Sequence, residues 1–210
     1  MKSTASLLLV IAAIGTPSAI HRPQFDPMHA AHLRVALNDQ AKDVPAKVAP
    51  DASLYQLDSA WNTDDERSIE LKALRGRCQL LALMFTRCTG ICPLTVAALR
   101  TFYRQLPKHA DDRIHVALVT IDPSDTSELL RAYRGKMQLD KDWLLLRGSP
   151  DSIRELSAAL GFSYEAQGDQ FAHTNQVTVL DRDGVVAHQQ AGIGGSIQEL
   201  QGALTRVCLR

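Results

Sequence analysis

Two cysteines separated by three residues are the most reactive feature of the sequence. Cys88 and Cys92 lie in the stretch FTRCTGICPLT, residues 85–95, after an apolar run and directly before Pro93. Two thiols at this spacing can form a redox pair, hold a soft metal ion, or pack as two small core residues. The rest of the chain must distinguish between these three possibilities.

A histidine much later in the chain is the residue expected to face the two thiols. Thiol-exchange enzymes of the thioredoxin class separate their cysteines by two residues and place a cis-proline before the strand that faces them. Here the gap is three residues, no proline follows Pro150, and the stretch GDQFAHTNQVTVL offers His173 instead. Two thiolates and one imidazole suit Cu(I), and they can hold Cu(II) with an added oxygen ligand. Zinc usually takes a fourth ligand, for which we find no candidate.

We therefore predict a copper site formed by Cys88, Cys92 and His173. A redox-only cysteine pair, beside a histidine in a solvated loop, remains the alternative. A peroxidase site is disfavoured because the chain lacks the Pro-x-x-x-Thr-x-x-Cys run that such sites use.

The thiols are expected at the start of a helix that follows a buried strand. QLLALMF, residues 79–85, is a short continuous apolar run, as in strands buried on both faces. After Pro93, LTVAALRTFYRQL spaces its apolar residues along one stripe of a helix. A four-residue step returns to the same helix face, so both sulfurs should point to one place. Because helix-start N–H groups favour thiolate, we expect lowered thiol pKa values.

The elements after this helix alternate and predict the fold class. A hairpin with an Asp-Gly turn is expected over 176–190, and a closing helix over 196–209. Between them and the cysteine helix we expect strands at 114–121 and 143–148 and helices at 127–137 and 149–161. This order predicts an α/β, thioredoxin-like three-layer fold, with a mixed central sheet and a C-terminal β-hairpin plus helix.

Three stretches occur in order along this predicted domain: FTRCTGICPLT, TIDPSDTSELLRAY and FAHTNQVTVLDRDG. Together they resemble the SCO/SenC family of copper chaperones. The resemblance implies one copper ion bound by the two cysteines and His173, with Asp122 as a candidate acid near the site. It also implies copper delivery, or thiol reduction, during assembly of the dinuclear copper centre of cytochrome c oxidase. The implied partner is a copper-receiving oxidase subunit or another periplasmic copper protein. The alternative is a periplasmic thiol-disulfide reductase that uses Cys88 and Cys92.

The N-terminus has the residue order of a secretory signal peptide. Lys2 precedes an apolar run that ends at Ile14, and small residues follow it. This run is shorter than the ~20 residues that span a bilayer. We expect residues 1–19 to be a signal peptide and the protein to be exported to the periplasm, not integral to a membrane once the signal is cleaved. Association with a membrane through an uncleaved N-terminus is the alternative.

The mature chain is expected to have an arm and one domain. Residues 20–52 are rich in proline and predict a flexible arm, and residues 53–210 predict the copper-binding domain. Four residues of the arm are further possible copper ligands: His21, Met28, His29 and His32. The 23 basic and 23 acidic side chains balance, which disfavours nucleic acid as a partner.

Cys78 and Cys208 lie outside the cysteine motif. Cys78 precedes the first buried strand, and Cys208 ends the last helix. Because unprotected thiols of exported proteins tend to pair, we predict a disulfide between them. Two inert buried thiols, or a second metal or redox site, are the alternatives.

Overall fold

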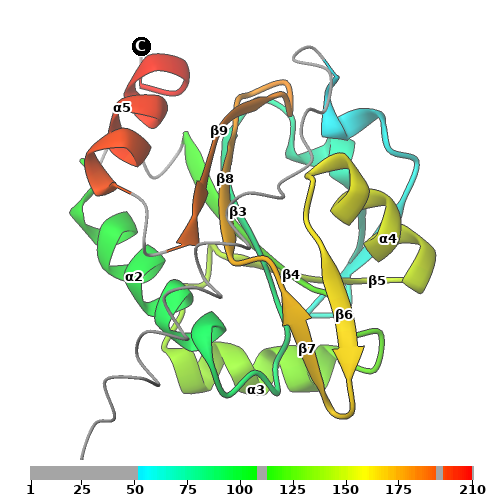
Figure 1. Ribbon diagram of the computed structural model, residues 1–210. Helices are drawn as coiled ribbons and strands as arrows, with labels where there is room; N and C mark the ends of the chain where they lie inside the picture. Colours follow the sequence, from blue (N-terminus) through cyan, green and yellow to red (C-terminus); the bar gives the residue numbers. More distant parts are fainter. Residues whose placement is uncertain (1–51, 108–112, 193–195, 210) are drawn as a thin grey trace, which may run out of the picture. The chain divides into compact units, whose positions relative to one another are not determined.

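A seven-stranded mixed sheet forms the centre of the protein in a computed structural model that describes residues 52–107, 113–192 and 196–209 (Figure 1). The strand order is β2-β1-β5-β4-β3-β8-β9. Strands β3, β4 and β5 are parallel, whereas β8 runs antiparallel to β3. The bounds are β1 Ala60–Thr63, β2 Ser68–Glu70, β3 Cys78–Met84, β4 Ile114–Thr120, β5 Leu144–Gly148, β8 Gln176–Leu180 and β9 Val186–Ala191.

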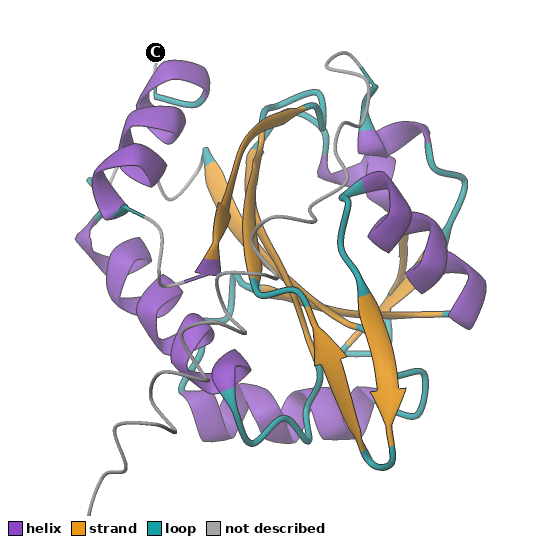
Figure 2. Ribbon diagram, in the orientation of Figure 1, coloured by secondary structure: helices purple, strands orange, loops and turns teal. Residues whose placement is uncertain are grey.

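Helices cover both faces of this sheet and complete three layers. Helices α2 and α5 lie on one side in the view of Figures 1 and 2, and α4 lies on the other. The bounds are α2 Ile91–Gln105, α3 Ser127–Met137, α4 Pro150–Ala159 and α5 Ile197–Val207, with 3-10 turns at Leu54–Gln56 and Leu71–Leu74. A separate antiparallel hairpin, β6 Tyr164–Gln167 and β7 Gln170–His173, does not pair with the central sheet.

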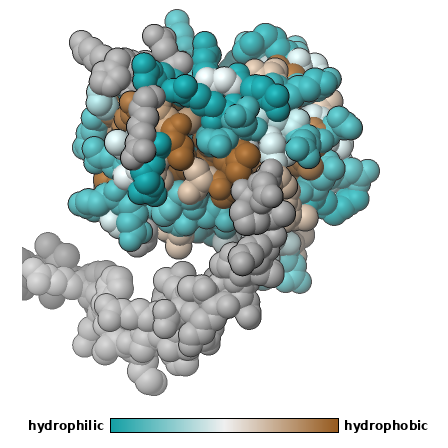
Figure 3. All heavy atoms as spheres, turned by 90° about the horizontal axis from the view of Figure 1, so that it is seen from above, coloured by the Kyte–Doolittle hydropathy of each residue, from teal (hydrophilic) through white to brown (hydrophobic). Residues whose placement is uncertain are grey.

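The core lies around the inner strands of the sheet, which include β4, β3 and β8. All seven residues of β3 and all five of β8 are buried. Apart from Gln79 and Gln176, these residues are apolar or β-branched, as in strands covered on both faces. Viewed from above, the surface is mostly hydrophilic, with small groups of apolar residues (Figure 3). Among the described large apolar side chains, the exposed ones are Leu94, Leu129 and Ile197.

The predicted fold class is confirmed, including the mixed sheet, the C-terminal hairpin and the closing helix. Helix α4 begins as expected: the Ser149 hydroxyl accepts from the N–H of Ser152, and Pro150 is the first helical residue. Gly161 follows the helix with φ of 62°, a conformation that favours glycine.

Four short strands were missed by the sequence interpretation: β1, β2, β6 and β7. The predicted signal peptide and nearly all of the predicted arm, including His21, Met28, His29 and His32, lie outside the described residues. Over the described part of the chain, we find no helix with the length and apolarity needed to cross a membrane.

Candidate metal site

Antiparallel pairing of β8 with β3 brings distant parts of the sequence together. Ala82 near the end of β3 pairs with Val177 near the start of β8. The segment that leaves β3 carries the two cysteines, and the segment that enters β8 carries His173. Both segments therefore lie at the same edge of the sheet, although 81 residues separate Cys92 from His173.

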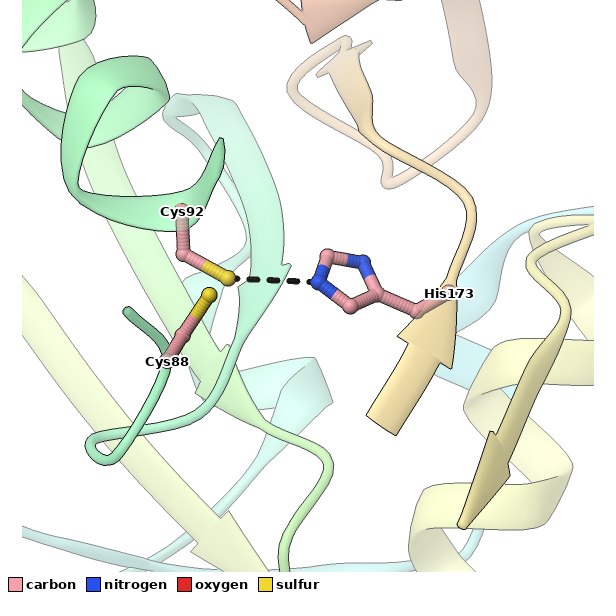
Figure 4. A group of neighbouring side chains, drawn as sticks. All are labelled: Cys88, Cys92 and His173. Atoms are coloured by element: carbon pink, nitrogen blue, oxygen red, sulfur yellow. Dashed lines mark hydrogen bonds between the residues drawn. The ribbon is translucent and has the colours of Figure 1, made fainter. Parts of the chain in front are cut away.

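The side chains of Cys88, Cys92 and His173 converge at this edge (Figure 4). One ligand atom from each of them lies within 4.8 Å of the others. Cys92 Sγ lies 3.3 Å from His173 Nε2. Within residues 52–107, 113–192 and 196–209, this is the one group of three such side chains close enough to hold a metal ion.

Two kinds of contact fix the His173 ring. Its Nδ1 lies 2.8 Å from the carbonyl oxygen of Thr174, and because a carbonyl can only accept, Nδ1 carries the proton. In the neutral ring, Nε2 therefore keeps its lone pair and faces Cys92. Phe162 stacks on the ring and Phe85 meets it edge-on, each with centroids 5.8 Å away. The ring is held with its ligating nitrogen toward the sulfurs.

The cysteines occupy different local structures, which corrects the expectation that both lie on one helix. Cys88 lies in the turn after β3, where its N–H donates to the carbonyl of Phe85. Cys92 is the second residue of α2, which begins after Gly90. Pro93 follows in the first helical turn, as predicted, where a missing N–H costs little. The turn, not a helical repeat, brings Cys88 close to Cys92.

The expectation of a lowered thiol pKa is wrong for Cys92. Burial disfavours the charged thiolate, and the neighbouring Cys88 thiol adds to this, so the pKa of Cys92 is raised well above its usual value. Backbone hydrogen bonds act in the opposite direction but are smaller. In this state Cys92 keeps its proton and can donate it to Nε2 of His173, which fits their 3.3 Å separation.

Two buried carboxylates hold the turn that carries Cys88. Asp125, with 0% exposure, accepts hydrogen bonds from the backbone N–H and the hydroxyl of Thr86. Asp122, 3% exposed, accepts from Arg87 at 2.6 Å. Burial alone would raise the pKa of Asp122, but hydrogen bonds from Ser124 and Arg87 outweigh it, and the pKa lies below its usual value.

Asp122, the candidate acid near the site, lies beside the turn that carries Cys88. Its carboxylate reaches Arg87, next to Cys88, and is not part of the converging group. Sequence interpretation missed Asp125 as the anchor of the turn. The sequence could have indicated this role. Both acids follow β4, and the carboxyl ends of the parallel strands β3 and β4 share one sheet edge, so these acids should lie near the segment that follows β3.

The other two of the four cysteines form a pair of their own. Cys78 and Cys208 form a disulfide with Cα atoms 5.9 Å apart, which confirms the predicted pairing. Both residues are fully buried. In contrast, Cys88 and Cys92 are free thiols. Among the described residues, the free thiols are therefore those of the converging group.

The converging group fits a soft metal ion. Bonds of about 2.3 Å to sulfur and about 2.0 Å to nitrogen, meeting at about 100–120°, place the two ligand atoms about 3.3–3.7 Å apart. The observed 3.3 Å between Cys92 Sγ and His173 Nε2 lies at the short end of that range. Both cysteines are buried and His173 is half-buried, so the side bearing the imidazole is the more open one. Two thiols and one imidazole favour Cu(I) over hard cations.

Comparison with known proteins gives a family and relatives. The SCO1/SenC family model matches residues 54–207. A protein of Stutzerimonas stutzeri, described as a candidate copper-binding protein, is 30% identical over 72% of this chain and 74% of its own length. The crystal structure of Arabidopsis thaliana ScoI with copper bound has a TM-score of 0.63 at 19% identity, over 70% of this chain and 94% of that one.

A further solved structure concerns BsSco, described as a member of the Sco family of cytochrome c oxidase assembly proteins in which a disulfide switch was identified. Its TM-score is 0.58 at 21% identity, over 70% of this chain and 90% of that one. At such identities, the two structural likenesses establish the thioredoxin-like fold alone.

Proposed function

The chain belongs to the SCO1/SenC family, and we propose that it is a copper metallochaperone that binds one copper ion through Cys88, Cys92 and His173. The observation that carries this proposal is the 3.3 Å approach of a lone-pair-bearing Nε2 to a cysteine sulfur, beside a second free cysteine. The names of the Stutzerimonas and Arabidopsis relatives, which refer to copper, support it.

Each ligand has a distinct part in holding the ion. The two sulfurs are soft donors that alone can hold Cu(I) in a nearly linear arrangement. His173 adds the nitrogen that Cu(II) prefers, and its proton on Nδ1 is already directed to the Thr174 carbonyl, so no tautomer change is needed. The imidazole is therefore more important for Cu(II) than for Cu(I).

Copper binding must displace protons from the thiols. The raised pKa of Cys92 means that this thiol is protonated around neutral pH in the metal-free protein. Binding through its thiolate releases that proton, so the apparent affinity should rise by about tenfold per pH unit for each proton released. Acidification should correspondingly favour release of the ion.

The proposed recipient is a copper-containing subunit of an oxidase, or another periplasmic copper protein. Support comes from the description of BsSco as a member of a family of cytochrome c oxidase assembly proteins. The protein would act outside the cytosol. The buried Cys78–Cys208 disulfide supports this location, because structural disulfides persist mainly in oxidising compartments. The signal-peptide pattern at residues 1–19 agrees with it.

A second function, thiol-disulfide reduction, is favoured by the same two free thiols. In this reaction a thiolate of the pair attacks a disulfide of the recipient, and the other cysteine resolves the mixed disulfide. The recipient gains two thiols, and Cys88 and Cys92 become a disulfide, so the two electrons balance. The disulfide switch named for BsSco supports this alternative.

Anaerobic titration of the chain with Cu(I), and separate titration with Cu(II), tests the proposal. We expect one copper per chain, loss of tight binding in Cys88→Ser and Cys92→Ser, and a larger loss for Cu(II) than for Cu(I) in His173→Ala. His188→Ala is the matched control, because His188 lies on β9 and contacts Gln190. Unchanged affinity in both serine variants would overturn the metal site. Reduction of a model disulfide that depends on the cysteines but not on His173, without copper binding, would favour the reductase.

A further inference from the structure

A hydrogen bond joins helix α2, which carries Cys92, to the segment that carries His173. The Thr95 hydroxyl donates to Oδ1 of Asn175 over 2.9 Å. Thr95 lies on α2 one turn after Cys92, and it is 4% exposed. Asn175 lies two residues after His173, in the segment that enters β8. This contact thus connects the element that holds one proposed ligand to the segment that holds another.

Asn175 is also enclosed on its other side. The N–H of Gly192, the residue directly after β9, donates to the Asn175 carbonyl over 2.9 Å. A Cβ atom at position 192 would overlap the Asn175 side chain, lying 2.5 Å from its Cγ. Only glycine leaves room for the amide in this arrangement. The Asn175 side chain is therefore confined between α2 and the end of β9.

The position of His173 needs such a support. In the described part of the chain, its strand β7 pairs with β6 alone, and this hairpin forms no ladder with the seven-stranded sheet. The rings of Phe85 and Phe162 restrain the imidazole, but ring contacts allow sliding more readily than hydrogen bonds do. Between α2 and residues 173–175, the side-chain hydrogen bonds found in the described chain are Thr95 to Asn175 and Cys92 to His173 themselves.

We propose that Thr95, Asn175 and Gly192 form a latch that holds His173 at bonding distance from Cys92. They are positioning residues and touch no metal. The inference rests on the proposed copper function and adds that the latch sets how well the site binds Cu(II), the ion that depends most on the imidazole. Cu(I), which two sulfurs can hold, should depend on the latch much less.

The principal variant is Thr95→Val, which removes the hydroxyl and nearly preserves the shape of the side chain. Loss of one buried hydrogen bond predicts a roughly three- to tenfold weaker Cu(II) affinity, with a change below about twofold for Cu(I). The sulfur-to-copper absorption of the Cu(II) form should shift toward that of His173→Ala. Thr95→Ser restores the hydroxyl and should recover the wild-type affinity and spectrum.

Thr101→Val is the matched control, because the Thr101 hydroxyl lies on the same helix and, among the described residues, bonds to the carbonyl of Ala97 and not to the site. It should leave both copper affinities unchanged. Gly192→Ala perturbs the latch from the opposite side and should weaken Cu(II) binding at least as much as Thr95→Val. If Gly192→Ala does not fold, the Thr95 variants alone test the latch.

Amide hydrogen exchange of residues 173–176 in the metal-free protein gives a readout that does not require copper. Faster exchange there in Thr95→Val, and not in Thr101→Val, is expected. Wild-type protein that binds no copper would overturn the proposed function, whereas this exchange result would still test the latch. Thr95→Val with unchanged exchange and unchanged Cu(II) affinity would overturn the latch. A lower melting temperature with unchanged Cu(II) affinity and spectrum would also overturn it, because a merely structural bond behaves in that way.

Discussion

Removing the Cys78–Cys208 disulfide should lower the stability of the domain substantially without changing the candidate site. The bond closes a loop with a sequence separation of 130. For that length, the restriction of the unfolded chain is worth about 5 kcal/mol at 25 °C, and native disulfides typically contribute about 2–4 kcal/mol. We expect Cys78→Ala/Cys208→Ala to lose about 3–5 kcal/mol of unfolding free energy. With a urea m-value of about 2 kcal/mol/M, the midpoint should fall by roughly 1.5–2.5 M.

Equilibrium urea denaturation of the metal-free protein measures this loss. Cys88→Ala/Cys92→Ala is the matched control, because it removes two buried sulfurs that form no cross-link. Its loss should reflect packing alone and be clearly smaller. Copper stoichiometry should be unchanged in the variant without the disulfide. Equal midpoints for the two double variants would refute the reasoning, as would free thiols at positions 78 and 208 in protein mapped without reduction.

Three further changes test other parts of the structure. Arg134→Leu should destabilise the protein by about 3–5 kcal/mol in urea denaturation, because it leaves the buried carboxylate of Asp64 without its partner at 2.6 Å. Tyr133→Phe should raise stability by up to about 1 kcal/mol, because the buried Tyr133 hydroxyl has no hydrogen-bond partner among the described residues; a decrease would contradict this. Asp122→Asn should be less stable than wild type above the ordinary carboxyl pKa of 3.8, and the difference should shrink as pH falls through the lowered pKa of folded Asp122. A difference that persists at lower pH would show that Asp122 acts through packing and not through charge.

The fold class and the three converging side chains were within reach of sequence reasoning because their signals are local. The apolar run of β3, the stripe of α2 and the Ser149-Pro150 helix start each depend on near neighbours in the chain. The absence of a proline after Pro150 disfavoured a thiol-exchange site and left His173 as the residue expected to face the thiols. The antiparallel pairing of β8 with β3 then brings the segment that enters β8, which carries His173, to the end of β3 from which the cysteine segment leaves.

The remaining features depend on contacts between distant residues or on burial. The hairpin of β6 and β7 is short and half-exposed, and its sequence lacks a clear alternation of apolar and polar residues. His173 was therefore expected in a loop, whereas it is the last residue of β7. The position of Cys92 at the start of a helix predicted a lowered pKa. Burial has the larger effect and raises the pKa, and the burial of Cys92 depends on the whole fold. The Thr95–Asn175 bond spans 80 residues and has no sequence signature.

The long separation between the cysteine pair and His173 has a consequence for biogenesis. During synthesis the thiols are complete at residue 92, whereas the imidazole follows 81 residues later and reaches them only after β8 docks beside β3. An immature chain thus presents a bare dithiol, able to take up Cu(I) or to form a premature Cys88–Cys92 bond. Stable capture of Cu(II), in the proposed function, requires the mature tertiary structure. Resistance of bound Cu(II) to a chelator would then report how far the nascent protein has folded.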